Sequence, residues 1–275
     1  MTTQQPATAG PRILDPTEFF HSGVTAFFAL QSDQRFSYCL YIPTAHQKTA
    51  RPLPLVVVVH GTNRTAERYR TMFREFAEEH SCIVLAPLFP AGIIEPDDLN
   101  NFKRILYHDI RFDEILLSMI DQIGARYRVE TDRFLLHGFS GGGQFAHRFA
   151  YLHPHRISAL SIGAPGRITR INPDVPWWLG TADVKEVFGI DLDLTELAKV
   201  PVQMLVGADD VDTWEIAEPG IDAGGDTRVE RLMTLRDNWE AHGISVRFDL
   251  VGGMGHSGSA AIPQAQDFFS GVLTR

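Results

Sequence analysis

Apolar and polar residues follow two kinds of pattern along this chain. Short apolar runs bounded by turn residues are typical of strands, and they occur at residues 24–30, 36–42, 55–60, 83–86, 133–137, 158–162, 202–206 and 244–251. Between them, apolar residues recur at helical spacing at residues 65–79, 109–127, 144–152 and 228–242, with a further helical stretch at the C-terminus. Strands that alternate with helices predict an α/β fold, a mainly parallel sheet flanked by helices on both faces.

The carboxyl ends of the predicted strands are where chemistry is expected. We expect residues 24–30 and 36–42 to pair as antiparallel strands through the polar turn at 31–35. In a mainly parallel sheet, ligands bind in the crevice beyond the carboxyl ends of the strands. Polar residues that directly follow a strand are therefore the candidates for a functional site.

A serine follows one of these strands on a short glycine-rich turn. Residues 138–142, with the sequence GFSGG, lie between the run at 133–137 and the helical stretch at 144–152. A G-x-S-x-G turn from strand to helix exposes the serine hydroxyl as a nucleophile, and its glycines allow strand and helix to pass closely. A plain glycine-rich turn is the alternative interpretation. The position of the turn favours Ser140 as a nucleophile.

A serine hydroxyl is a poor nucleophile until a neighbouring base accepts its proton. Of eleven histidines, most lie in strand-like runs, on helical stretches or in polar segments without a partner pattern. His256 lies in the sequence GGMGHSG, which directly follows the run at 244–251. A histidine on such a loop lies at the same edge of the sheet as Ser140, so we interpret His256 as the base.

The acid that orients this histidine is expected after another strand. The sequence GADDVD follows the buried run at 202–206 and contains three aspartates. A carboxylate here accepts a hydrogen bond from the imidazole and holds it in the tautomer that deprotonates serine. We select Asp210, while Asp209 and Asp212 remain alternatives.

These motifs together resemble the α/β-hydrolase superfamily from about residue 24 to the C-terminus. The order Ser140, Asp210, His256 matches that superfamily, as does the sequence LVVVVHG at residues 55–61. The resemblance implies an oxyanion hole formed by the backbone N–H groups of Thr62 and Gly141. Within the superfamily, the sequence FSYCLYIP at residues 36–43 is similar to polyhydroxybutyrate-depolymerase and feruloyl-esterase-like hydrolases.

The resemblance implies a serine hydrolase that cleaves carboxylic esters through an acyl-enzyme, without a metal or another cofactor. Peptidase, amidase or thioesterase activity is the alternative, because the same groups serve all of these reactions. A hydrolase fold used only for ligand binding is a third hypothesis. The expected partner is a small-molecule ester or related acyl compound, and the sequence does not determine an oligomeric state.

Two segments are candidates for the substrate pocket. Residues 167–200 separate two predicted strands over a distance too long for a bare loop, so we expect a small lid or pocket wall there. Trp177 and Trp178 within it, and Phe89 after an earlier strand, are candidates to line the pocket. Aromatic residues serve packing equally well, so the alternative is that they attach these segments to the core.

Two other motif interpretations are weaker. The sequence GGGQFA at residues 141–146 partly fits a dinucleotide-binding turn, but no carboxylate follows about 20 residues later. His153 and His155 resemble a metal-ligand pair without an evident third ligand, so we expect surface histidines at a helix end.

Composition limits the class of protein further. With 275 residues, 44% of them hydrophobic, we expect one catalytic domain at residues 16–275 after a loose N-terminal segment at 1–15. A formal net charge of −9 argues against nucleic acid as a partner. The polar, uncharged first ten residues do not resemble a signal peptide, no apolar run is long enough to cross a membrane, and the two cysteines form no disulfide framework. We therefore expect a cytoplasmic protein that acts on small or medium-sized esters.

Overall fold

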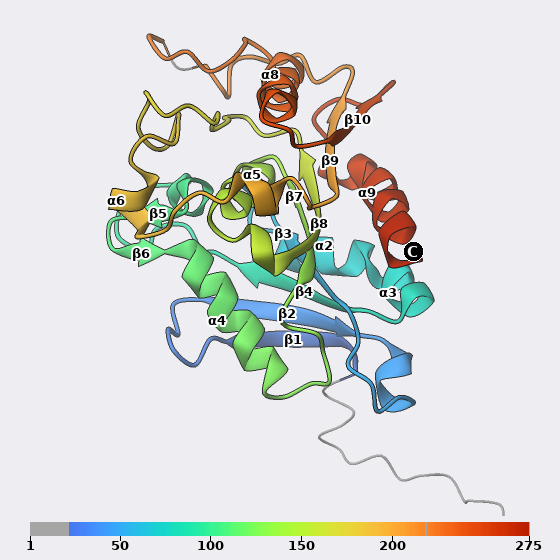
Figure 1. Ribbon diagram of the computed structural model, residues 1–275. Coiled ribbons are helices and arrows are strands. Elements are labelled where there is room, and N and C mark those ends of the chain that lie inside the picture. Colours follow the sequence, from blue (N-terminus) through green and yellow to red (C-terminus); the bar gives the residue numbers. More distant parts are fainter. Residues whose placement is uncertain (1–21, 218, 275) are drawn as a thin grey trace, which may run out of the picture.

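An eight-stranded sheet runs through the part of the protein that the computed structural model describes, residues 22–217 and 219–274 (Figure 1). Its strand order is β1-β2-β4-β3-β7-β8-β9-β10. The strands are β1 (Gly23–Ala29), β2 (Ser37–Ile42), β3 (Leu55–Val59), β4 (Ile83–Leu88), β7 (Phe134–Phe139), β8 (Ile157–Gly163), β9 (Val202–Gly207) and β10 (Val246–Val251). β2 pairs antiparallel with β1 and β4, and all other neighbours are parallel. The predicted mostly parallel sheet is confirmed.

The central strands are buried and mainly apolar because both faces of the sheet are covered. All residues of β3, with the sequence LVVVV, are buried, as are all residues of β7 and β9. Strands buried on both faces of a parallel sheet read as continuous apolar runs rather than as alternating ones. β10 lies at the edge and is only partly buried, which agrees with its alternating sequence VRFDLV.

Helices flank the sheet on both faces, as predicted. On one face α2, α3 and α9 contact one another, and α9 packs on β7, β8 and β9 (Figure 1). On the other face α4 and α5 lie across the sheet, where α5 packs on β3, β7 and β8 (Figure 1). The helices are α2 (Ala66–Met72), α3 (Arg74–His80), α4 (Phe112–Gly124), α5 (Gly141–Leu152), α6 (Val184–Phe188), α7 (Leu194–Leu197), α8 (Arg228–Ala241) and α9 (Gly258–Leu273). None of the helices in the described ranges is both long and apolar enough to span a membrane.

Two helices differ in extent from the sequence prediction. The helix expected at residues 65–79 is divided at Phe73, whose torsions (φ −91°, ψ 5°) leave the helical range. The helix expected at residues 109–127 begins only at Phe112, because the preceding residues form a small hairpin of β5 (Leu106–Tyr107) and β6 (Ile110–Arg111). Helical spacing of apolar residues does not locate such breaks, because the apolar side chains stay on the inner face.

The segment at residues 167–200 folds against the body of the protein and contains α6 and α7. Val184, Phe188 and Leu197 are buried in it. The Trp177 indole N–H donates to the Arg104 carbonyl oxygen at 2.9 Å, and its ring contacts Phe188 edge-on. The loose segment predicted at residues 1–15 lies outside the described residues.

Candidate active site

Ser140 lies at the turn between β7 and α5, in a backbone conformation that few residues adopt. Its torsions are φ 57° and ψ −115°, outside the regions favoured by L-residues. Its N–H donates to the Gly163 carbonyl oxygen of the neighbouring strand β8 at 2.8 Å. Such torsions cost energy and persist only where the surrounding structure enforces them. The turn projects the Ser140 side chain beyond the carboxyl end of the sheet.

The glycines beside Ser140 are required because neighbouring backbone segments come too close there for a side chain. A Cβ on Gly138 would lie 2.1 Å from the Gly142 carbonyl oxygen, and one on Gly142 would lie 2.3 Å from the Val59 carbonyl oxygen. Both distances are far below van der Waals contact, and the opposing atoms belong to the backbone. The G-x-S-x-G pattern is therefore a consequence of how closely β7, α5 and β3 meet.

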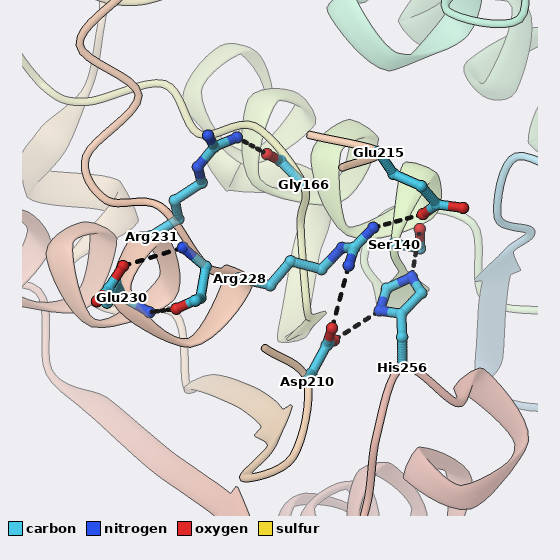
Figure 2. A network of polar contacts seen from close by, with 9 residues as sticks. Ser140, Gly166, Asp210, Glu215, Arg228, Glu230, Arg231 and His256 are labelled. Atoms are coloured by element: carbon cyan, nitrogen blue, oxygen red, sulfur yellow. Dashed lines mark hydrogen bonds and ion pairs between the residues drawn. The ribbon is translucent and has the colours of Figure 1, made fainter. Parts of the chain in front are cut away.

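His256 and Asp210 complete a hydrogen-bonded chain with Ser140 (Figure 2). The His256 Nε2 atom lies 3.0 Å from Ser140 Oγ, and its Nδ1 atom lies 2.6 Å from Asp210 Oδ2. Because a carboxylate only accepts hydrogen bonds, Nδ1 carries the proton and Nε2 is left to accept from the serine hydroxyl. This arrangement suits proton transfer from Ser140.

The structure distinguishes among the three aspartates of the loop after β9. Asp210 is 1% exposed and faces His256, whereas Asp209 and Asp212 are exposed. The loop is attached to the histidine loop by backbone hydrogen bonds, since the Asp209 N–H donates to the Met254 carbonyl oxygen at 3.0 Å. The two loops are thus positioned together, with Asp210 directed inward.

An arginine that the sequence analysis did not single out binds the other oxygen of Asp210 (Figure 2). Arg228, the first residue of α8, donates from Nη1 to Asp210 Oδ1 at 3.1 Å and from Nη2 to Glu215 Oε2 at 2.6 Å. The Arg228 side chain is 3% exposed and the Asp210 side chain 0%. Both carboxylate oxygens of Asp210 therefore have a partner, which fixes the plane of the carboxylate against His256.

The backbone N–H groups of Thr62 and Gly141 converge beside Ser140. A Cβ placed on Gly141 would lie 3.2 Å from the Thr62 nitrogen, and one placed on Gly61 would lie 3.7 Å from Ser140 Cβ. Among the described residues, no acceptor takes up either N–H. Arg64 donates to the Thr62 carbonyl oxygen at 2.5 Å and so fixes this peptide loop. Backbone N–H groups without an acceptor are able to donate to a negatively charged oxygen.

His60 occupies a structural position under this loop. It is completely buried, with Nδ1 2.8 Å from the Gly61 carbonyl oxygen, and Nε2 accepts from the Phe89 N–H at 3.0 Å. Burial lowers the pKa of His60 to about 4. A neutral imidazole with both nitrogens occupied attaches the loop after β3 to the loop after β4.

A cavity of about 600 Å³ opens beside Ser140 and His256. Its lining combines polar, aromatic and cationic side chains, among them Thr62, Arg68, Tyr69, Lys103, Phe139, Arg167, Trp214 and Glu215. The Trp214 side chain at the rim is 76% exposed. Neither Lys103 nor Trp214 was indicated by a sequence motif, because each lies in a segment without regular periodicity.

The structure does not bring Phe89, Trp177 and Trp178 to this cavity, since none of the three belongs to its lining. Phe89 is completely buried and contacts the rings of His60, Phe102, Phe112 and Phe145. The Trp178 ring lies under the guanidinium groups of Arg104 and Arg148 at 4.6 and 5.2 Å. These aromatic residues pack and anchor the segments that carry them. Of residues 167–200, Arg167 is the member that lines the cavity.

The expectation that His153 lies on the surface is wrong. His153 is 6% exposed, and its Nε2 lies 2.8 Å from Asp113 Oδ2 in the interior. With Glu114, these residues form a group whose ligand atoms all lie within 4.8 Å. Arg111 binds both Asp113 oxygens, at 2.9 and 2.6 Å. The guanidinium supplies the positive charge that a metal ion would bring, so this group is an ion-pair network.

Comparison with known proteins identifies the fold. No protein-family profile and no curated protein matches the sequence. Among solved structures, poly(aspartic acid) hydrolase-1 from a Sphingomonas species has a TM-score of 0.75 at 22% identity, over 90% of this chain and 98% of that one. A poly(3-hydroxybutyrate) depolymerase from Bordetella parapertussis has a TM-score of 0.75 at 24% identity, over 93% of each chain. An S-formylglutathione hydrolase from Agrobacterium tumefaciens has a TM-score of 0.62 at 18% identity, over 92% of this chain and 99% of that one. This chain therefore has the α/β-hydrolase fold, as the sequence resemblance implied.

Proposed function

We propose that this α/β-hydrolase-fold protein is a serine hydrolase that cleaves carboxylic esters. The observation that carries the proposal is the unbroken chain of hydrogen bonds from Asp210 through His256 to Ser140 at the carboxyl edge of the sheet. A protein that only binds ligands has no need of a strained serine aligned with a base and an acid. The similar solved structures include a depolymerase and two hydrolases, which agrees with a hydrolytic role.

The reaction is acyl transfer to water in two steps. Ser140 Oγ attacks the ester carbonyl carbon while His256 Nε2 accepts its proton, and the same proton passes to the departing alcohol as the carbon–oxygen bond breaks. Water then attacks the acyl-enzyme, gives its proton to His256, and releases the acid and free Ser140. Asp210 orients the imidazole and stabilises the imidazolium formed in each step.

The N–H groups of Thr62 and Gly141 stabilise the oxyanion of each tetrahedral intermediate. Each preorganised donor is worth about 3 kcal/mol of barrier in sites of this kind. Gly141 begins α5, so the N-terminal dipole of that helix adds to the effect. None of these steps requires a metal or another cofactor.

Amide and thioester hydrolysis are the second candidates, because the three comparison proteins are named for three different substrates. A matched set of 4-nitrophenyl ester, 4-nitroanilide and thioester substrates with the same acyl group separates the three activities. Ester hydrolysis as the main activity predicts the largest kcat/KM for the ester after correction for the uncatalysed rates.

The proposal is tested by labelling with a fluorophosphonate probe and by turnover of short 4-nitrophenyl esters. We expect stoichiometric labelling of the wild type and loss of both labelling and turnover in Ser140→Ala. Ser118→Ala, on helix α4, is the matched control and should behave as wild type. A wild type that neither reacts with the probe nor turns over esters, amides or thioesters would favour the ligand-binding alternative.

A further inference from the structure

The cavity beside Ser140 is positively charged, although the whole chain carries a formal net charge of −9. Its lining includes Arg68, Lys103 and Arg167, and one carboxylate, that of Glu215. Glu215 is already paired with Arg228 at 2.6 Å. The lining therefore presents more positive than negative charge to a bound molecule, against the balance of the protein as a whole.

Lys103 is the most unusual of these cations because it is buried. It is 6% exposed, and its Nζ donates to the neutral amide oxygen of Asn100 at 2.9 Å. In residues 22–217 and 219–274, no carboxylate lies within ion-pair distance of this ammonium. An ammonium taken from water without a counter-ion costs several kcal/mol, and buried charges are ordinarily paired. The structure thus maintains an unbalanced charge at this place.

The position of Lys103 connects it to the reaction centre. A Cβ placed on Gly141 would lie 3.0 Å from Lys103 Cε and 3.2 Å from the Thr62 nitrogen. The lysine side chain therefore lies directly against the peptide groups assigned to the oxyanion hole. Lys103 and Ser140 line the same cavity, so one bound molecule can contact both.

Neighbouring charges confirm that Lys103 belongs to a cationic cluster. Burial, together with Arg64 and Arg167, lowers the pKa of Lys103 to about 8, while Asp98 and Glu215 act in the opposite direction. Arg64 is engaged by the carbonyl oxygens of Thr62, Phe89 and Leu99. Arg167, like Lys103 and Arg68, lines the cavity.

We propose that the substrate carries a carboxylate that Lys103 and Arg167 bind in the same cavity as the scissile carbonyl group. The inference rests on the proposed serine-hydrolase function and names the class of its substrate. A carboxylate offers two oxygens to the two cationic side chains and supplies the counter-ion that Lys103 lacks in the free protein. The favoured substrates are thus esters, or related acyl compounds, of acids or alcohols that bear a second, free carboxylate.

The experiment compares pairs of esters that differ only in this charge. On the acyl side, mono-4-nitrophenyl adipate is compared with its methyl ester. On the leaving-group side, 4-acetoxybenzoate is compared with 4-acetoxybenzamide. The measured quantity is the ratio of kcat/KM for the anionic to the neutral member of each pair. The ratio in the wild type, divided by the ratio in Lys103→Met, removes differences in intrinsic reactivity.

We expect Lys103→Met to lower kcat/KM by about 10–100-fold for the anionic member of at least one pair, as for loss of a charged hydrogen bond, and much less for its neutral partner. Arg167→Gln should lower kcat/KM for the anionic member of the same pair of esters. Lys103→Arg should restore most of the preference for the anionic over the neutral ester. Lys185→Met, which removes an exposed lysine, is the matched control and should leave both ratios unchanged. Thermal unfolding of each variant shows whether the fold is retained.

Two results would overturn the inference. An equal loss for anionic and neutral esters would mean that Lys103 stabilises the oxyanion or the fold, and unchanged ratios would mean that it binds no carboxylate. Fluorophosphonate labelling separates these results from failure of the proposed function. A wild type that labels at Ser140 but shows no dependence on Lys103 refutes only the carboxylate assignment, whereas absence of labelling refutes the hydrolase itself.

The pH dependence supplies a readout that a structural role for Lys103 would not move. In the free enzyme Lys103 is charged below pH 8 and neutral above it, so the anionic-to-neutral ratio of kcat/KM should fall as the pH rises through about 8. An arginine side chain is ordinarily protonated throughout this range. Lys103→Arg should retain its ratio up to pH 10, and a wild-type ratio that stays constant from pH 7 to 10 would contradict the assignment.

Discussion

The imidazole of His256 lies between two oxygens of different chemical character. Asp210 Oδ2 is 2.6 Å from Nδ1, and Ser140 Oγ is 3.0 Å from Nε2. The Phe139 ring lies 5.0 Å from the imidazole and limits its movement on one side. Because the shorter bond goes to the buried carboxylate, the tautomer is determined by Asp210, and Ser140 meets an acceptor nitrogen.

Replacement of Asp210 by Asn is expected to abolish the selection of the His256 tautomer. An amide can donate as well as accept, so the imidazole adopts the other tautomer and presents N–H to Ser140. We expect kcat for a 4-nitrophenyl ester to fall by about 10⁴-fold with the fold retained, as for loss of the acid in comparable sites.

Asp209→Asn and Asp212→Asn are the matched controls, since both side chains are exposed on the same loop. Each should keep kcat within a few-fold of the wild type. If Asp209→Asn or Asp212→Asn is as damaging as Asp210→Asn, the assignment of the acid is wrong.

At this scale the sequence indicates Ser140 and His256 well, because each lies in a local glycine-rich pattern directly after a strand. Arg228 and Lys103 have no such pattern. A weak signal exists for Arg228, because a cation at the first position of a helix opposes the helix dipole and needs a compensating partner. That partner, Asp210, is 18 residues away, so only folding reveals it.

At the scale of elements, the junction of β3, β7, β8 and α5 determines where Ser140 lies. Gly142 and Gly143 allow the first turn of α5 to pass against β3 and β8, since a Cβ on either would lie 2.3 Å from a carbonyl oxygen. The backbone atoms there have no freedom to withdraw. The position of the serine thus depends on residues that carry no chemistry of their own.

Gly142→Ala is therefore expected to destabilise the protein by about 3 kcal/mol or more, as for overpacking against a rigid neighbour, and to reduce ester turnover through displacement of Ser140. Gly271→Ala is the matched control, because Gly271 is exposed in helix α9 and a Cβ there meets nothing within 4 Å. It should stabilise the helix by about 0.5–1 kcal/mol. Urea unfolding measures the free energy of unfolding of both variants. An equal change in Gly142→Ala and Gly271→Ala would contradict the packing argument.

The beginning of α8 links this helix to the candidate site (Figure 2). Thr227 and Glu230 form a capping box in which each side chain accepts a hydrogen bond from the backbone N–H of the other. The capped turn places Arg228 between Asp210 and Glu215. Thus a local motif, readable as T-x-x-E, determines the direction of a side chain that acts on a distant loop.

Arg228→Met should remove the partner of a fully buried carboxylate oxygen. We expect a loss of about 3 kcal/mol in the free energy of unfolding, because removal of one partner of a buried ion pair leaves the other without compensation. We also expect kcat to fall by about tenfold or more, since a small displacement of Asp210 misdirects His256.

Arg133→Met is the control for loss of an exposed ion pair, that with Glu196, and should lower the stability much less than Arg228→Met. Chemical unfolding and kcat on a 4-nitrophenyl ester are measured for both variants. If Arg228→Met had the same stability and kcat as the wild type, Asp210 would need no second hydrogen-bond partner.

At the scale of the whole molecule, the folded core contains three completely buried histidines, His60, His137 and His147. Burial lowers the pKa of His60 and of His137 to about 4, and it lowers the pKa of His147 well below its ordinary value. His147 Nδ1 lies 2.8 Å from the Gly143 carbonyl oxygen, and its Nε2 accepts from the Thr169 N–H. The folded state therefore holds all three in the neutral form.

This burial makes stability depend on pH. The unfolded chain binds a proton at each histidine below about pH 6.5, whereas in the folded state His60 and His137 bind one only as the pH approaches 4, and His147 only well below its ordinary pKa. Stability should thus be complete above pH 6.5 and should fall by about 2 kcal/mol for each of His60 and His137 between pH 7.5 and pH 5, with a further loss in the same direction from His147. Urea unfolding at pH 7.5, 6 and 5 measures this difference.

His137→Asn removes one of the three groups and should reduce the difference between pH 7.5 and pH 5 by about 2 kcal/mol. His242→Asn, at the exposed end of α8, serves as the control and should not change it. Equal stability of the wild type at both pH values would show that the buried histidines take up protons in the folded state.

The sequence by itself determined where the main strands lie along the chain, that their sheet is mainly parallel, and where Ser140 and His256 follow a strand. These features are local: an apolar run five to seven residues long, or a glycine-rich turn after it, is present in the chain before it folds. The sequence also limited the acid to one loop, because GADDVD is the acidic turn that follows β9.

Tertiary structure alone decided which aspartate is hydrogen-bonded to His256, which side chain binds that aspartate, and which side chains line the cavity. Those outcomes depend on distances between residues far apart in the chain, such as the 46 positions between Asp210 and His256. Packing contacts likewise keep Phe89, Trp177 and Trp178 away from the cavity, whereas Lys103 belongs to its lining. The physical reason is that apolar periodicity specifies which face of an element is buried, whereas loops without periodicity take their conformation from the contacts they make after folding.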